Sequence, residues 1–437
     1  MFAYYFLLGL RSLRRNPALT ALMVLTLAIG VAASVSTLTI LHVMSGDPIP
    51  QKSGRLFAAI IDNGPKEGYV PGAKPGDHQL SYRDVVNLLA SGQGERRTGL
   101  YRIGVVIEPS RVDLGVVSAE GVAATKDFFA MFDLPFLYGQ AWREVDDKNG
   151  ADVVVLSRKT SEKIFGLANP VGQRIHMLNG DFQVVGVLDN WAQRPRFYAY
   201  NGRSAAFSIE EEFLIPLNSA IRHETTHEGS MSCSGDRGAG WQALLDSECT
   251  WLHFWFELKS ETQRVDLQNY IDHYVAEQRK LGRYKREEKN RLFNVREWLT
   301  EMHIIGDDSK LSAWLAFGFL LLCLVNTIGL LLAKFSVRAS EVGVRRALGA
   351  SRRQIFMQFL IETSVVGVVG ALVGVVLAFG ALALIGMQSK HLAVVAHMDW
   401  TMLALTFILS VGAAVLAGLL PTWRACQVTP AIQLKSQ

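Results

Sequence analysis

Residues 334–353, KFSVRASEVGVRRALGASRR, lie between two long apolar runs and carry six basic residues against the single acid Glu341. Short loops rich in Lys and Arg stay in the cytoplasm, so this stretch predicts a cytoplasmic loop between two membrane spans. Such a loop is either a solvated basic element at the membrane surface or a rigid lever that receives force from a cytoplasmic partner. Apolar residues at roughly helical spacing predict an amphipathic helix with the arginines opposite; they are Val342, Val344, Ala347, Leu348 and Ile355.

Four apolar runs without Asp, Glu, Lys or Arg are present, at residues 16–46, 311–333, 363–389 and 400–423. Each is longer than the about 20 residues that cross a bilayer. We therefore predict transmembrane helices at residues 18–42, 311–333, 359–387 and 400–423. The first run is too long for a signal peptide and lacks a clear cleavage site, so we interpret it as a retained span.

The distribution of charge predicts a membrane protein with four transmembrane α-helices, one before and three after a large mixed α/β domain. The N-terminal elbow helix of residues 1–17, with Arg11, Arg14 and Arg15, should lie on the inner membrane surface. The coupling loop or helix of residues 334–358 and the tail of residues 424–437 should face the cytoplasm, as should both termini. The domain of residues 43–310 and the turn of residues 388–399 should face the periplasm of a bacterial inner membrane.

Short patterns predict the elements of the outside domain. Strands are expected at residues 153–156, 174–177 and 182–187, with a hairpin turn at Asn179-Gly180. Helices are expected at residues 81–89, capped by Ser81, at 125–132 and at 261–281. The aromatic residues 251–256 indicate a buried strand. In the longest helix the inward residues should be Val265, Leu267, Ile271, Tyr274 and Val275.

Two further patterns each allow two interpretations. Residues 191–198, WAQRPRFY, could form a contact surface for a protein partner or a loop that closes over the domain's own core. Pairs of small residues four apart in the spans could pack helices within one unit or form a seam between subunits; they are Gly30 and Ser34, Gly370 and Gly374, and Ala414 and Gly418.

Cysteine and histidine supply two candidate sites. Cys233 and Cys249 would form a disulfide if their domain faces an oxidising periplasm, whereas Cys323 and Cys426 should be free. His223, Glu224 and His227 match H-E-x-x-H, in which two histidines one helical turn apart bind zinc and the glutamate is the general base. The threonines between them and the glycine and serines that follow disfavour a helix, so we expect no catalytic metal here.

Several function classes are excluded. The net charge is only +4, and the basic residues gather at the ends of apolar runs, which argues against nucleic-acid binding. The sequence has no Gly-Lys dipeptide and hence no P-loop, so we expect a chain that is not itself an enzyme and binds no cofactor. Without charges inside the apolar runs, a proton-driven or ion-driven carrier is not expected.

Three groups of motifs, in order along the chain, resemble the MacB/FtsX-type permeases of ABC transporters. The first is VVVLS at 153–157 with IFG at 164–166, NPVG at 169–172 and FQVVG at 182–186. The second is EVGVRRALGASRRQI at 341–355, and the third is PTWRA at 421–425 with PAIQL at 430–434.

The resemblance implies a dimer of permeases, each docking an ATP-binding subunit that uses ATP and Mg. Residues 19–40 and 311–333 would form the dimer seam, and the second permease could be another copy or a related chain. A periplasmic adaptor and an outer-membrane channel are also expected. The docking element would include Glu341, Gly343, Arg345, Arg346, Leu348, Gly349, Ala350, Arg352 and Arg353, helped by residues 11–15 and the tail after Pro421.

This chain departs from the family's pattern at two places. It opens on the elbow without an ATPase domain, which implies a separate ATPase subunit, and residues 190–250 are unusually rich in Cys, His and Trp. The leading hypothesis is an efflux or export permease that couples cytoplasmic ATP hydrolysis to motion of its periplasmic domain. The alternatives are an FtsX-like transducer that controls a cell-wall hydrolase, a lipoprotein-release permease, and a zinc peptidase that uses His223, Glu224 and His227.

Overall fold

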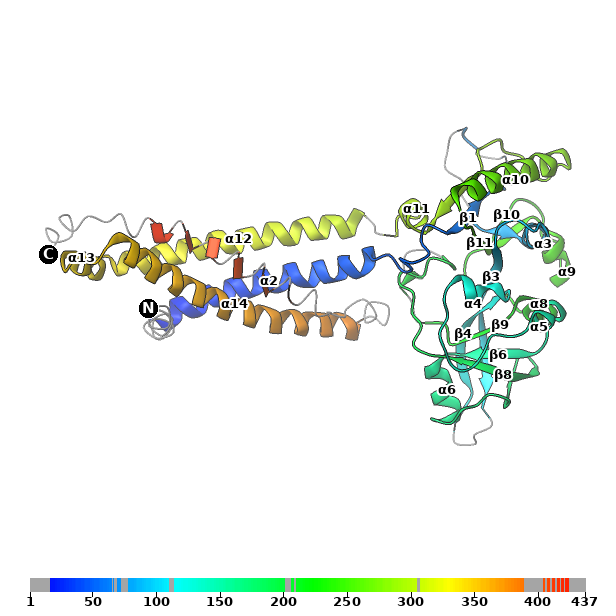
Figure 1. Cartoon of the computed structure of the whole chain (residues 1–437), viewed down its shortest axis with the longest axis horizontal. Coiled ribbons are helices and arrows are strands. Elements are labelled where there is room, and N and C mark those ends of the chain that lie inside the picture. The colour runs from blue at the N-terminus through cyan, green and yellow to red at the C-terminus, as the bar shows by residue number, and fades with distance from the viewer. Residues whose placement is uncertain are drawn as a thin grey trace. The chain divides into compact units, whose positions relative to one another are not determined.

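A computed structural model (Figure 1) describes residues 16–64, 66, 69–71, 78–109, 114–200, 206–207, 210–304 and 307–388, with scattered positions between 404 and 423. The chain divides into two compact units. Residues 46–304 form one, which we call the outer unit, and the described residues before and after it form the membrane unit. The elbow through Arg15, the turn at 389–399 and the tail from Arg424 lie outside the described residues.

The membrane unit contains the helices α2 (Pro17–Ser45), α12 (Asp307–Val337), α13 (Ala339–Ala347) and α14 (Arg352–Gln388). Within the described residues, Pro17–Ser45, Leu311–Val337 and Arg352–Met387 are long and apolar enough to cross a membrane. These helices confirm the first three predicted spans. The predicted fourth span, residues 400–423, falls mostly outside the described residues and stays a prediction.

Small residues let α2 pack closely against both α12 and α14. A Cβ atom added at Gly370 would lie 2.8 Å from Leu27, and one at Gly374 would lie 2.8 Å from Val31. On the other side, Ser34 donates a hydrogen bond of 3.0 Å to the carbonyl of Ala316 in α12. For these residues, the interpretation as packing within one unit is therefore the one that the structure supports.

The outer unit is built on one mixed sheet with the strand order β12-β1-β11-β3-β4-β9-β6-β8-β5, and β2, β7 and β10 pair beside this path. Most neighbours are antiparallel, but β4 pairs with β9 and β6 with β8 in parallel. The strands are β1 (Leu56–Ile60), β2 (Leu80–Ser81), β3 (Arg96–Glu108), β4 (Val117–Ala124), β5 (Phe136–Gly139), β6 (Val153–Leu156), β7 (Arg174–Met177), β8 (Gly180–Leu188), β9 (Phe213–Pro216), β10 (Ser232–Cys233), β11 (Cys249–Glu257) and β12 (Arg291–Asn294).

Helices cover this sheet (Figure 1), and some of them start at a residue whose side chain accepts a backbone N–H. Ser81 accepts a hydrogen bond from the backbone N–H of Asp84, as the sequence predicted. Asn294 and Glu297 form a capping box at the start of α11. The helices are α3 (Tyr82–Ala90), α4 (Asp127–Met131), α5 (Glu144–Asn149), α6 (Arg158–Phe165), α8 (Leu217–Arg222), α9 (Trp241–Asp246), α10 (Glu261–Lys280) and α11 (Val295–Glu301).

Two local predictions need correction. The β7–β8 turn is centred on Leu178 and Asn179, which have φ values of 51° and 56°, and Gly180 is already paired with Met177. A two-residue type I′ turn requires positive φ at both central residues, which fixes this register. In α10, Leu267 and Ile271 are buried as predicted, whereas Val265 is exposed because it lies outside the stripe that faces the sheet.

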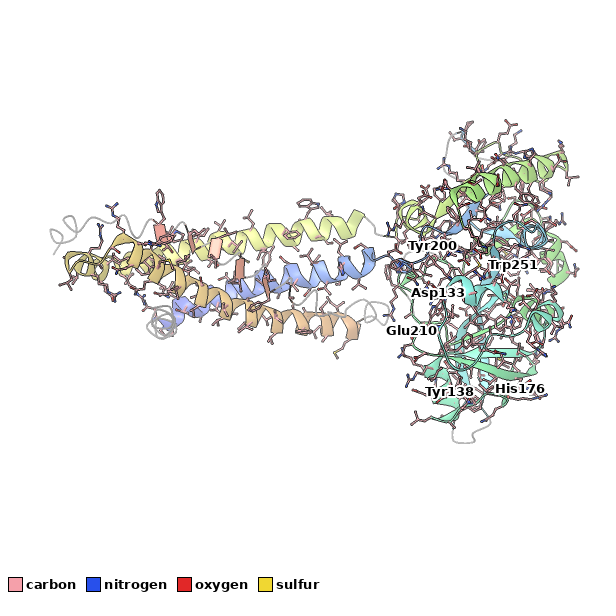
Figure 2. All side chains as sticks on the ribbon, viewed as in Figure 1. Asp133, Tyr138, His176, Tyr200, Glu210 and Trp251 are labelled. Atoms are coloured by element: carbon pink, nitrogen blue, oxygen red, sulfur yellow. A yellow bond between two sulfur atoms is a disulfide. The ribbon has the colours of Figure 1, made fainter. Side chains whose placement is uncertain are left out.

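Residues 191–198 close over the domain's own core rather than forming an exposed contact surface. Three indole N–H groups hold this loop in place. Trp255 of β11 donates to the carbonyl of Tyr198 at 3.0 Å, and Trp298 of α11 donates to that of Phe197 at 3.1 Å. Trp191 donates to Phe132 at 3.3 Å. The nine residues of β11 are all buried, which confirms the predicted buried strand; Figure 2 labels Trp251 within it.

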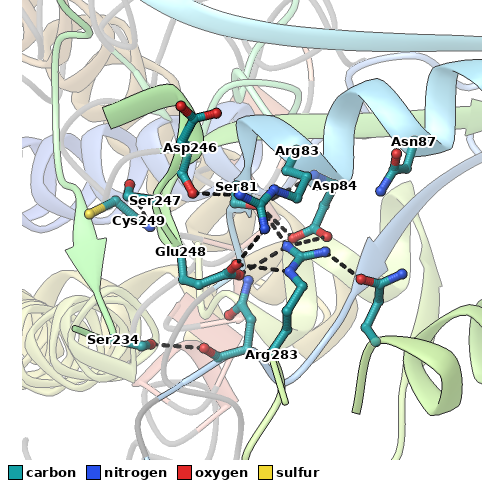
Figure 3. A network of polar contacts seen from close by, with 12 residues as sticks. Ser81, Arg83, Asp84, Asn87, Ser234, Asp246, Ser247, Glu248, Cys249 and Arg283 are labelled. Carbon is teal, nitrogen blue, oxygen red and sulfur yellow. Dashed lines mark hydrogen bonds and ion pairs between the residues drawn. The ribbon is translucent and has the colours of Figure 1, made fainter. Parts of the chain in front are cut away.

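A polar network ties α3 to the loop after α10 (Figure 3). Arg283 lies 2.9 Å from the buried carboxylate of Asp84 and 2.8 Å from Glu248. Tyr274 of α10 also donates to Asp84, at 2.6 Å. Glu248 immediately precedes Cys249, which forms a disulfide with Cys233 between the neighbouring strands β10 and β11.

Candidate coupling site

The stretch between α12 and α14 is not the single amphipathic helix that the sequence predicted. The helix α13 ends at a left-handed turn, where Gly349 has φ of +94°. The backbone N–H of Ala350 donates to the carbonyl of Arg345 at 3.0 Å, and that of Gly349 donates to the carbonyl of Arg346 at 3.1 Å. This is the hydrogen-bond pattern of a Schellman motif. Ser351 then exchanges hydrogen bonds with Gln354 and starts α14. Glycine is what allows this sharp reversal.

An apolar cluster seats α13 against the ends of the long helices. Val342 of α13 and Ile355 of α14 are buried together with Leu331. The rings of Phe335 and Phe359 lie 4.5 Å apart in the same cluster. The reversal after α13 is therefore packed on one side and does not hang free as a loop.

The opposite side of the reversal presents apolar side chains to the surroundings. Leu348 is 84% exposed and Val344 is 56% exposed, and Arg352 and Arg353 beside them are also exposed. The predicted apolar stripe was therefore wrong for Val344, Ala347 and Leu348, which are exposed because they lie around α13 from the buried Val342. We call the segment from Val344 to Arg353 the coupling knob.

The side chain of Arg345 contacts Glu341 on its own helix and Gln358 on α14. Its guanidinium lies 2.6 Å from Glu341 and donates to the side-chain oxygen of Gln358 in α14 at 2.9 Å. The predicted docking residues thus divide into two groups. Leu348, Gly349, Arg352 and Arg353 are exposed on the coupling knob, whereas Glu341, Gly343, Arg345, Arg346 and Ala350 are half-buried.

A buried acid that the sequence reasoning missed lies beneath this element. Glu362 of α14 is 2.8 Å from the ammonium of Lys334, and both side chains are almost fully buried, at 5% and 0% exposure. The guanidinium of Arg338 donates to both carboxylate oxygens of Glu362, at 3.0 and 3.1 Å. The sequence could have indicated this buried acid, because Glu362 is the only acidic residue in α14 and directly precedes a long apolar run.

The H-E-x-x-H pattern does not form the helical pair that a zinc peptidase uses. The helix α8 ends at Arg222, and Glu224 has a positive φ of 51°. The Nε2 atom of His223 is 2.8 Å from Asp152, whereas the ring of His227 lies against Trp251 at 5.6 Å. Burial, aided by the charge of Arg237, lowers the pKa of His227. Within the described residues, no three His, Cys, Asp or Glu side chains group as a metal site.

The structure describes three of the four cysteines. Cys233 and Cys249 are joined, and Cys323 is free and buried where α12 meets Gly30 of α2. Cys426 lies outside the described residues.

Comparison with protein families gives a consistent result along the whole chain. The family model of the MacB-like periplasmic core domain matches residues 20–274, and that of the FtsX-like permease C-terminal region matches residues 313–430. The chain therefore belongs to the MacB/FtsX-type family of ABC transporter permeases. It is a membrane protein with a domain of the MacB periplasmic type, and this family is the permease component rather than the catalytic one.

Similar curated proteins are larger exporters. The pyoverdine export ATP-binding/permease protein PvdT of Pseudomonas syringae pv. syringae is 27% identical over 71% of this chain and 42% of its own length. The macrolide export ATP-binding/permease protein MacB of Marinobacter nauticus is 24% identical over 98% of this chain and 60% of its own length. The chain thus spans less than two thirds of either relative.

Among solved structures, the periplasmic region of MacB from Actinobacillus actinomycetemcomitans is 13% identical. It covers 59% of this chain and 96% of its own, with a TM-score of 0.36.

Proposed function

We propose that this chain is the permease subunit of an ATP-driven, MacB-like exporter in a bacterial inner membrane. An ATP-binding subunit, which uses ATP and Mg, docks on the coupling knob in the cytoplasm. Its closure on ATP moves the membrane helices and, through them, the periplasmic outer unit. The proposal rests on the family membership and on the exporter names of the relatives.

The main observation in favour of docking is that Leu348 is exposed while the apolar cluster around Val342 holds α13 in place. A leucine that is 84% exposed between α13 and α14 is ready to be buried by a partner. Rigid presentation reduces the entropy that docking must overcome. The exposed Arg352 and Arg353 beside it favour a partner whose apolar groove has an acidic rim.

The outer unit has features that suit mechanical coupling. The strands β1 and β12, the first after α2 and the last before α12 in the chain, are hydrogen-bonded neighbours. Arg296 of α11 also lies 2.8 Å from Asp47, and the N–H of Val295 donates to Ser53 at 3.2 Å. A movement that enters through either chain connection therefore reaches the same edge of the sheet.

The wider assembly follows from the same proposal. Two permeases, identical or related, associate through α2 and α12, and the outer units work with a periplasmic adaptor and an outer-membrane channel. With the coupling knob in the cytoplasm, both termini lie on the same side. No ATP or Mg is held by residues 1–437 in this scheme, because the sequence contains no Gly-Lys dipeptide.

Co-purification of the chain from its native membrane in mild detergent tests the proposal. We expect an ATP-binding subunit to remain bound to the wild-type chain and to be lost from Leu348→Asp. Losing the burial of a leucine side chain costs about 1.5–3 kcal/mol, or about 10–150-fold in affinity. Leu167→Asp is the matched control, because Leu167 is also 84% exposed but lies in the outer unit.

The proteins recovered also discriminate among the hypotheses. An adaptor that accompanies the ATP-binding subunit supports the exporter. A cell-wall hydrolase in its place supports an FtsX-like transducer, and a preparation without any ATP-binding subunit refutes the docking proposal.

A further inference from the structure

The buried acid Glu362 receives two cations that come from successive turns of the chain. Lys334 belongs to α12, whereas Arg338 follows the end of α12 and is the residue at which α13 begins. We propose that the Arg338–Glu362 contact is a positioning contact that locks α13 to α14, so that a force on the coupling knob moves α12, α13 and α14 together. The role of this lock in coupling rests on the function proposed above, but the lock itself does not.

Burial gives the Arg338–Glu362 contact its strength. Glu362 lies among the apolar side chains that seat α13, with Phe359 and Val366 on the same helix. A carboxylate removed from water is stable only when cations and hydrogen-bond donors compensate it. Moving α13 away from α14 would separate Arg338 from Glu362 and leave charge uncompensated, so the contact resists this movement.

The geometry distinguishes the two cations. Arg338 donates to both oxygens of Glu362 at 3.0 and 3.1 Å, and such a forked contact fixes direction as well as distance. Lys334 approaches one oxygen as a point charge from within α12. Arg338 can therefore set the direction in which α13 leaves α12, whereas Lys334 only holds α12 beside α14.

A second contact completes the lock at the other end of α13. Arg345 donates to Gln358, which lies one helical turn before Glu362 on α14. One face of α14 thus holds α13 near both of its ends. The Schellman turn then joins α13 to α14 with little freedom. The four contacting side chains are Arg338, Arg345, Gln358 and Glu362.

Spin labelling of the full chain tests the lock without any partner. The label is placed on Leu348→Cys in a chain whose other free cysteines are removed by Cys323→Ala and Cys426→Ala. Arg338→Met and Lys334→Met are then compared, because each leaves one cation paired with Glu362. We expect equal label mobility in the parent and in Lys334→Met, and a more mobile label in Arg338→Met, because the backbone that carries residue 348 is then no longer held.

Equal spectra for Arg338→Met and Lys334→Met would overturn the proposal, because neutralising Glu362 would then be the only role of either cation. If Arg338→Met does not fold, Arg338→Lys keeps the charge and removes only the fork. A label that is more mobile in Arg338→Lys than in the parent supports the lock, and a parent-like spectrum refutes it. A chain that shows the lock but binds no ATP-binding subunit contradicts the proposed function alone.

Discussion

The contact between α14 and α2 makes the clearest prediction about the membrane unit. A Cβ atom at Gly374 would lie 2.8 Å from one methyl group of Val31, 3.0 Å from its Cβ and 3.1 Å from the carbonyl oxygen of Ala28. The last of these is backbone, so the helices themselves must separate. Overpacking of this kind costs about 1–3 kcal/mol. Gly374→Ala should therefore destabilise the membrane unit, although alanine favours a helix by about 1 kcal/mol over glycine.

Gly380→Ala separates the packing penalty from the helix preference. Gly380 lies on the same helix, and a Cβ atom there would have no neighbour within 4 Å. The two variants should thus differ by about 1–3 kcal/mol, which corresponds to a melting temperature roughly 2–10 °C lower for Gly374→Ala.

The buried thiol of Cys323 supplies the assay. Cys323 packs against Gly30 of α2, so it should react with a thiol-specific fluorophore only when α2 separates from α12. The full chain is heated in detergent with Cys426→Ala as the background. Equal melting temperatures for Gly374→Ala and Gly380→Ala would refute the close packing. A change in subunit association without a change in melting temperature would place Gly374 at a seam between subunits.

Three further predictions concern the outer unit. Arg283→Met leaves the buried Asp84 without its cation and should cost about 3–5 kcal/mol, measured as faster amide hydrogen exchange in α3. Burial, with a smaller contribution from His78, lowers the pKa of His253 to about 3. The free energy of unfolding should therefore decrease as pH falls from about 6.5 to about 3, because the unfolded chain binds a proton at His253 that the folded chain does not. His253→Gln should remove this pH dependence from the melting profile. The Cys233–Cys249 disulfide spans a sequence separation of 16, and Cys233→Ser with Cys249→Ser should destabilise the unit by about 3 kcal/mol in urea.

Each of these predictions has a control. Lys280→Met removes an exposed ion pair near Arg283 and should cost less than about 1 kcal/mol. Asp147→Asn tests the opposite pH dependence. Burial raises the pKa of Asp147 to about 6, so the free energy of unfolding should decrease as pH rises from about 4 to 6. Asp147→Asn should remove this decrease. Parent and serine variants should unfold alike once the parent disulfide is reduced. An unchanged α3 exchange rate, an unchanged acid profile or equal stability before reduction would contradict the respective prediction.

Periodicity and charge predicted the features that depend on nearest neighbours in sequence. The first three spans, the Ser81 cap and the buried strand at 251–256 were of this kind. The coupling segment shows where the approach fails. Apolar spacing extended one helix through Gly349, but this left-handed glycine ended the helical segment, and Leu348 just before it is exposed. Helical spacing cannot reveal the chain reversal, because a glycine inside a helix has the same spacing as a glycine that ends one.

The candidate site was predicted only in part for a related reason. The basic residues of the coupling segment were visible, but their acid partner Glu362 lies on the next helix. Likewise, H-E-x-x-H specifies five residues and not a helix, and α8 ends at Arg222, before both of its histidines. Both outcomes depended on contacts between segments that are distant in sequence.

The sequence by itself determined that this chain enters a membrane, because apolar runs of this length have no comparable alternative in water. It also determined the family, through motif order, whereas the cytoplasmic side of the basic loop stays a prediction from charge. Only the tertiary structure decided which glycines pack within one unit, that Cys233 meets Cys249, and that Glu362 joins Lys334 to Arg338. These are contacts between different segments, and their stability comes from burial and pairing, which local sequence does not record.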